Sequence, residues 1–228
     1  MPAPLTKQQI NAFRHTVCET ATRQLATRGV DKVSMRSLAE ELGCSATMLY
    51  SYFSNKDELV ATTRTAAYNR LSKRLEQALA TTTDPWQQSR AIGTAYLAFA
   101  REEPESYRLI FAFRQPCLSD YPKLAAADER SRRCLTGYIE NMVNAGLLEG
   151  DPEILAHLFW SAMHGLIQLD MAGKFEHAGL SFDVLRHEMM RLITRGARAD
   201  LHGNTAAATN GPPTPYTHDK HFTSSPDE

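Results

Sequence analysis

The sequence predicts an all-α protein built in two helical parts. Residues that cap helices recur ahead of stretches in which apolar side chains return every three or four positions, as on one face of a helix. Glycine or proline separates these stretches, and none shows the sustained apolar and polar alternation of a strand. We therefore expect no β-sheet.

The first helix follows a short arm. Thr6 and Gln9 have the spacing of a capping box, and Gly29 marks the end of the helix. One face is apolar and should pack across the next two helices: Ile10, Phe13, Val17, Ala21 and Leu25.

Residues 33–56 hold two short helices around a glycine. Ser34 can cap the first helix, and Gly43 stands where the chain needs a positive φ. Ser45 can cap a second helix of about two turns, with Leu49 and Phe53 facing inward. This order is typical of a helix-turn-helix, which presents its second helix to the major groove of DNA.

Further caps and prolines divide the remainder into helices. Asn55 and Glu58 form a candidate capping box that opens a long connecting helix over residues 56–80. Later helices are expected to begin at Pro85 and Pro104 and to span residues 123–144, 152–172 and 182–199, with a loop over residues 115–122. The helix over residues 152–172 is apolar on nearly every side, so it must be buried in its own part or against a second chain. In the last helix, the side chains expected to face inward are Val184, Leu185, Met189, Leu192 and Ile193.

Composition limits the possible classes. The 228 residues are 43% hydrophobic and 22% charged, which is ordinary for a soluble globular protein. No apolar run could span a membrane, and no secretory signal begins the chain, so we expect a cytoplasmic protein without a membrane partner. The four cysteines lack the C-x-x-C spacing of a zinc site, and we expect no metal and no cofactor.

Charge is distributed unevenly. Residues 1–75 carry 11 Lys and Arg against 6 Asp and Glu, whereas the remainder carries 14 against 20. A basic first third joined to an acidic remainder indicates one anionic partner and a separate second task.

Over residues 10–59 the chain resembles the DNA-binding domain of the TetR/AcrR repressors. The residues that match the family signature are Leu49, Tyr50, Phe53 and Lys56. Thr47 stands where the family often has glycine, and Met48 where it often has threonine. Both lie on the recognition helix, so they bear on which operator is read.

The resemblance implies a DNA-facing surface that begins at Ser45. Ala46, Thr47 and Met48 would face the bases, with Tyr50 and Tyr52 at the DNA backbone and Arg36 reaching a base or a phosphate. Lys56 stands at a helix N-terminus, where an anion is already favoured, and would hold a phosphate. Simpler roles remain open: a core aromatic for Tyr50, a solvated charge for Arg36, and an ion pair with Glu58 for Lys56.

A recognition helix with few polar base contacts needs a second copy to reach operator affinity. Two half-sites on one side of the duplex, about 34–36 Å apart, predict a homodimer and a palindromic double-stranded operator. The resemblance implies that residues 152–172 and 182–199 form a four-helix bundle with their counterparts. Gly165 would allow a close approach there; a glycine kept only for flexibility is the alternative.

Trp160, His164 and Gly165 resemble the Trp-His-Gly (WHG) subgroup of TetR-type C-terminal domains. An indole and an imidazole one turn apart could line a cavity for a small apolar or aromatic effector. The candidate ligand-binding residues are Tyr96, Phe99, Tyr107, Phe111, Tyr138, Trp160 and His164. A packed core with His164 bonded to a buried carbonyl is the alternative.

The sequence thus predicts a homodimeric repressor released from its operator by a small molecule; a ligand-independent regulator or an activator is the alternative. No catalytic constellation is present, so we expect no enzyme. The predicted organisation is an arm (1–6), a helix-turn-helix DNA-binding domain (7–67), a helical ligand-binding and dimerisation domain (68–200) and a disordered tail (201–228).

Overall fold

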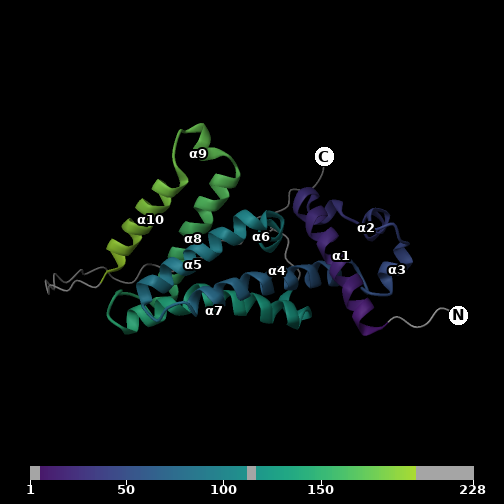
Figure 1. Ribbon diagram of the computed structural model, residues 1–228, viewed down its shortest axis with the longest axis horizontal. Helices are drawn as coiled ribbons and strands as arrows, with labels where there is room; N and C mark the ends of the chain where they lie inside the picture. The colour runs from purple at the N-terminus through teal and green to yellow at the C-terminus, as the bar shows by residue number, and fades with distance from the viewer. Residues whose placement is uncertain (1–5, 112–116, 199–228) are drawn as a thin grey trace, which may run out of the picture.

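The computed structural model describes residues 6–111 and 117–198. Within these ranges all regular structure is helical, as the sequence predicts (Figure 1). The α-helices are α1 (Lys7–Arg28), α2 (Met35–Glu41), α3 (Ala46–Tyr50), α4 (Lys56–Leu79), α5 (Pro85–Glu102), α6 (Pro104–Ile110), α7 (Pro122–Asn144), α8 (Pro152–Met171), α9 (Lys174–His177) and α10 (Phe182–Ala197). The expected tail, nearly all of the expected arm and the first part of the loop expected at 115–122 lie outside the described residues.

Side-chain caps begin most helices where the sequence predicts them. Thr6 and Gln9 form the predicted capping box of α1. The side chains that accept a backbone N–H at the starts of α2, α3, α5 and α8 are those of Ser34, Ser45, Asp84 and Asp151. Gly43 follows α2 with a φ of 64°, which only glycine adopts without strain.

The capping box predicted for Asn55 and Glu58 forms only in part. The Asn55 side chain accepts the backbone N–H of Glu58 at 2.8 Å. The Glu58 carboxylate, however, accepts the backbone N–H of Ser54 at 2.7 Å and also the Ser54 hydroxyl at 2.7 Å. The reciprocal bond is therefore displaced by one residue from the position that the pattern predicts.

Two clusters of buried apolar side chains organise the molecule, and α4 contributes to both. The N-terminal cluster joins α1, α2, α3 and the first turn of α4, where Leu59 and Val60 are buried. The C-terminal cluster joins the rest of α4, including Leu71 and Leu75, with α5 to α10. Figure 1 shows α1, α2 and α3 at one end of the molecule and α4 running from them along α7. A movement of α4 would therefore be felt in both clusters.

Two expectations about the helices need correction. Val184 and Leu192 do not face inward, because each is 61% exposed, whereas Leu185 and Ile193 pack against the C-terminal cluster. The last helix, α10, packs against α8, and Val184 and Leu192 stay at the surface. The second correction concerns α3, which was expected to have about two turns and to include Phe53. It has only five residues, and Phe53 is buried beyond its end.

The short helix α9 was not predicted; it follows Gly173 and buries Phe175. In the described part of the chain, no helix combines the length and the apolar character needed to cross a membrane.

Candidate DNA interface and effector cavity

Two buried side chains fix α3 on the N-terminal cluster and leave its other faces open. Leu49 and Phe53 are buried, whereas Met48 is 37% and Tyr50 53% exposed. The Ser45 hydroxyl accepts the backbone N–H of Met48 at 3.1 Å and caps the helix. The start of α3 is therefore ordered by a cap and displayed to solvent.

Arg14 of α1 ties the segment after α3 in place. Its guanidinium donates a hydrogen bond to the carbonyl of Tyr52 and lies 4.3 Å from the centre of the Phe53 ring. A carboxylate oxygen of Glu58 in α4 lies 3.7 Å from the Arg14 guanidinium. Hydrogen bonds from Ser54 hold the pKa of the Glu58 carboxyl below its usual range, so this partner stays charged. The sequence pattern gave no sign of this role for Arg14.

The eight residues predicted to face DNA fall into two groups. Most of them are exposed: Arg36, Ser45, Thr47, Met48 and Tyr50. Ala46 and Tyr52 are partly buried against the N-terminal cluster, and the Tyr52 ring lies 4.7 Å from that of Phe13. Lys56 is half-buried at the first position of α4. Exposure makes DNA contact possible for the first group, and contact itself stays a prediction for all eight.

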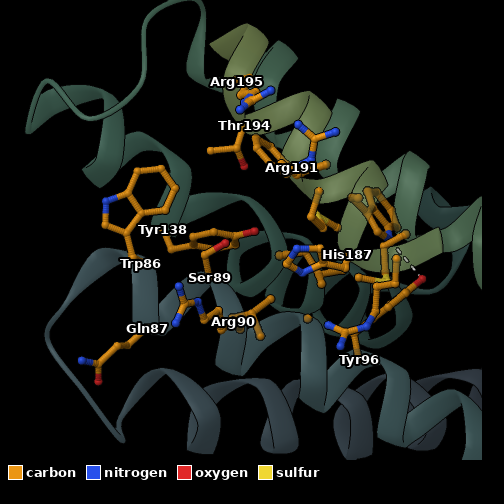
Figure 2. Close-up of a pocket in the computed structure, with 18 of the residues that line it drawn as sticks. Trp86, Gln87, Ser89, Arg90, Tyr96, Tyr138, His187, Arg191, Thr194 and Arg195 are labelled. Carbon is orange, nitrogen blue, oxygen red and sulfur yellow. Dashed lines mark hydrogen bonds between the residues drawn. The ribbon is translucent and has the colours of Figure 1, made fainter. Parts of the chain in front are cut away.

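A cavity of about 950 Å³ lies between α5 and α10, with α7 and α8 supplying its remaining walls. We call it the α5–α10 cavity. Figure 2 shows the side chains of α10 on one side, those of α5 on the other, and Tyr138 of α7 between them. Its main apolar and aromatic lining residues are Trp86, Ile92, Tyr138, Phe159, Trp160, Met163 and Met190.

Both ends of α10 are anchored, and its middle forms the cavity wall. Phe182 and Ala197 are buried in the C-terminal cluster. The Arg101 guanidinium lies 4.8 Å from the centre of the Phe182 ring, and the carbonyl of Ala197 accepts the backbone N–H of Glu149 at 2.8 Å. With its ends fixed in this way, α10 holds the cavity open between itself and α5.

A hydrogen-bonded group of four side chains adjoins the cavity, and we call it the His164 network. The Trp160 indole N–H donates to the Tyr96 hydroxyl at 3.1 Å. His164 Nδ1 lies 2.7 Å from the hydroxyl of Tyr107 and 3.2 Å from that of Tyr96. Burial lowers the pKa of His164, so the neutral imidazole is favoured, and burial raises the pKa of Tyr96 to about 12. The network joins α5, α6 and α8 through neutral groups.

The His164 network leads to α4 through α6. Tyr107 lies in α6, as does Leu109, whose side chain is buried in the N-terminal cluster. The Leu109 carbonyl accepts a hydrogen bond from Arg64 Nε of α4 at 3.1 Å. A second bond joins Arg70 of α4 to the Ser106 hydroxyl at 2.7 Å. The cavity is therefore linked to the connecting helix by short, specific contacts.

Three of the seven predicted ligand-binding residues line the α5–α10 cavity: Tyr96, Tyr138 and Trp160. Phe99 and Tyr107 are buried in the C-terminal cluster instead. Phe111 and His164 are not among the lining residues, and their rings meet edge to face with centres 4.5 Å apart. Sequence reasoning missed the basic residues of the lining, which are Arg90, Arg186, His187, Arg191, Arg195 and Arg198. For Arg186, His187, Arg191 and Arg195, their recurrence along the last helix was the available signal.

No three His, Cys, Asp or Glu side chains gather closely enough to hold a metal ion within residues 6–111 and 117–198. His157 Nδ1 lies 2.7 Å from the Glu153 carbonyl oxygen of its own helix. The histidines at 218 and 221 lie outside the described residues.

Two family models match this chain. Residues 17–63 match "Bacterial regulatory proteins, tetR family", and residues 89–193 match "Tetracyclin repressor-like, C-terminal domain". The second description does not name the Trp-His-Gly subgroup, which stays a prediction.

Proteins of similar sequence are named as transcription regulators. The chain is 30% identical over 127 residues to the HTH-type transcriptional activator FasR of Mycolicibacterium smegmatis, a match that covers 54% of this chain and 55% of FasR. It is 26% identical over 196 residues to the HTH-type transcriptional regulator Rv0681 of Mycobacterium tuberculosis, covering 85% and 86% of the two chains. The chain thus spans about half the length of the first relative and most of the second.

A solved structure of a TetR family transcription regulator from Marinobacter aquaeolei VT8 has the same fold. The TM-score is 0.70 at 18% identity, and the match covers 85% of this chain and 100% of the other. Matches to both the N-terminal and the C-terminal family models, on an all-helical fold with an exposed helix-turn-helix, lead to one conclusion: the chain belongs to the TetR family of transcription regulators.

Proposed function

We propose that the chain acts as a homodimeric repressor that leaves a palindromic operator when a small molecule fills the α5–α10 cavity. The contacts proposed for the DNA are those of Arg36, the start of α3 and Lys56. The residue boundaries expected from the sequence, 7–67 for the DNA-binding domain and 68–200 for the remainder, are retained as part of this proposal.

An exposed apolar surface supports the homodimer. Ile154 of α8 is 62% exposed, and Leu158 and Leu169 are exposed on the same stripe of that helix. Gly165 lies on this stripe, and a Cβ placed there would meet no atom of the chain within 4 Å. Together with Val184 and Leu192 of α10, this surface is larger than scattered exposed side chains would give. It is the surface that a second copy of α8 and α10 would cover.

The observation that carries the effector proposal is the His164 network. Trp160 and Tyr96 line the α5–α10 cavity and also belong to the network, whose Tyr107 stands in α6. A ligand that displaces the indole or the Tyr96 hydroxyl would change the bonds that hold α6. Because α6 is bonded to α4 through Arg64 and Arg70, the change would reach the helix that sets the positions of the two α3 helices.

The mechanism requires a difference in affinity. A ligand that binds the released arrangement more tightly than the DNA-bound arrangement shifts the population toward release, and a ligand with equal affinity for both shifts nothing. The cavity and the operator surface then form two linked sites on one molecule.

Activation is the second candidate, because FasR, a relative at 30% identity, is named a transcriptional activator. The same contacts serve either sign of regulation, since the sign depends on where the operator lies relative to the promoter.

The proposal is tested by selecting DNA from a random pool with the purified full chain, with and without a small-molecule cell extract. The expected result is a set of sequences with dyad symmetry, released when the extract is added. Enriched sequences without symmetry would contradict the homodimer, and complexes that resist every extract fraction would contradict effector control. Placing the selected operator upstream or downstream of a reporter promoter then distinguishes repression from activation.

A further inference from the structure

The α5–α10 cavity has walls of different chemical character. Five arginines and His187 line it: Arg90 comes from α5, Arg198 follows the end of α10, and the others lie in α10. One carboxylate, that of Asp84, lies among the lining residues. Asp84 accepts the backbone N–H of Gln87 at 2.7 Å, so it serves as the cap of α5. The charge of the lining is therefore strongly positive.

Two of the arginines on α10 are balanced by acidic neighbours. Arg191 binds the carboxylate of Glu188 at 2.6 Å, and Arg186 lies 3.7 Å from Asp183. Arg90 and Arg195 differ, because no carboxylate lies within ion-pair distance of either among the described residues. Arg198 lies over the Trp86 ring, 5.7 Å from its centre.

The arginines without an ion pair are exposed at the rim, whereas the buried lining residues of α7 and α8 are mainly apolar. Arg90, Arg195 and Arg198 are exposed. Tyr138, Phe159 and Met163, by contrast, are buried and face the cavity from α7 and α8. A guanidinium at the mouth of an apolar cavity recognises carboxylate or phosphate oxygens by paired hydrogen bonds and repels cations.

From this arrangement we infer that the α5–α10 cavity binds amphipathic anions, in which an apolar chain or ring system carries a carboxylate or phosphate head. The apolar body lies against Tyr138, Phe159 and Met163. The head lies at the rim, to which α5 contributes Arg90 on one side of the cavity and α10 contributes Arg195 on the opposite side (Figure 2). A cavity of about 950 Å³ accommodates such a molecule. The sequence predicts a small apolar or aromatic effector, and the inference adds a negatively charged head group to that description. Its consequence at the operator rests on the proposed function.

The chain provides its own probe for binding. It has two tryptophans, Trp86 and Trp160, and both line this cavity. Intrinsic tryptophan fluorescence therefore reports directly on the site without any DNA. The experiment titrates the full chain with dodecanoate, dodecyl phosphate and dodecanol, below the concentrations at which they form micelles. Dodecanol has the same chain without a charge.

We expect the affinity for at least one of the two anions to exceed that for dodecanol by about tenfold or more. The anion with the higher affinity identifies the preferred head group. In Arg90→Gln/Arg195→Gln the affinity for that anion falls about tenfold or more, and dodecanol binding stays as in the wild type. Arg133→Gln is the matched control, because Arg133 lies on α7 outside the cavity lining and pairs with Glu129. That variant binds all three probes as the wild type does.

Two results would overturn the inference: dodecanol binding as tightly as both anions in the wild type, or unchanged anion affinity in the double variant. The first comparison needs no variant, so it stands even if the double variant folds poorly. Failure of the proposed function gives a different pattern. An anion that binds with the expected preference but leaves the operator complex intact contradicts effector control alone. If cell extract releases the DNA but dodecanol binds with the same affinity as both anions, only the anion inference is contradicted.

Discussion

Replacing Tyr107 with phenylalanine tests whether the His164 network carries the signal from cavity to DNA. The substitution removes a buried hydroxyl that lies 2.7 Å from His164 Nδ1 and 3.4 Å from the hydroxyl of Tyr96. The ring remains, and with it the contact with Phe111 at 5.0 Å between centres. The change therefore deletes one strong hydrogen bond and little packing.

The size of the effect follows from that bond. One buried hydrogen bond contributes about 0.5–1.5 kcal/mol, and His164 Nδ1 keeps only its longer bond to Tyr96, so the free energy of unfolding should fall by about 1–2 kcal/mol. A bond worth about 1 kcal/mol can bias the effector equilibrium by about fivefold at most. We therefore expect the ratio of operator affinities without and with effector to shrink, by up to about fivefold.

The assay measures operator affinity by fluorescence anisotropy, with and without a saturating effector fraction. Tyr138→Phe is the matched control, because Tyr138 also lines the cavity but its hydroxyl bonds to Ser89, outside the network. An unchanged affinity ratio in Tyr107→Phe, together with a reduced ratio in Tyr138→Phe, would refute the route through α6.

Three further changes probe the DNA surface and the network. Tyr50→Ala should weaken operator binding several-fold and leave the melting temperature unchanged, because the side chain is 53% exposed; a large loss of stability would instead make Tyr50 a core residue. Lys56→Ala should weaken binding to all sequences and reduce the slope of log affinity against log salt by about one unit per subunit; an unchanged slope would exclude a phosphate contact. Burial lowers the pKa of His164 from its usual value of about 6.5, so between that value and the lowered one the unfolded chain binds a proton that the folded chain does not. The free energy of unfolding should therefore fall as the pH is lowered through this window, by at most about 1.4 kcal/mol per pH unit from this residue. His164→Gln should flatten that dependence in denaturation curves, and identical profiles would contradict a buried neutral imidazole.

Local chemistry made much of the fold predictable. Thr6, Ser34 and Ser45 cap the helices that the sequence assigns to them, and Gly43 has the positive φ expected of it. These features depend on a few neighbouring residues, so a single sequence contains them. Glu58 shows where such reasoning fails. The pattern predicts that its carboxylate accepts the backbone N–H of Asn55, but it accepts that of Ser54.

The candidate cavity depended on contacts between distant helices, which the sequence does not display. The aromatic residues of α5 and α6 could not be assigned to core or cavity from spacing, and Tyr107 is buried whereas Tyr96 reaches the cavity wall. The position of Arg195 in the cavity depends on α10 lying across from α5, and this is a contact between distant helices. Val184 was expected to face inward for a related reason: apolar spacing does not distinguish a surface that meets the chain's own core from one left exposed.

Hydroxyl-radical footprinting of the selected operator tests the central claim most directly, namely that one molecule presents α3 twice to successive grooves on one side of DNA. The account predicts two protected patches on one face of the duplex, about 34–36 Å apart and related by dyad symmetry, both lost when effector is added. A single protected patch, or two patches that persist at saturating effector, would contradict it.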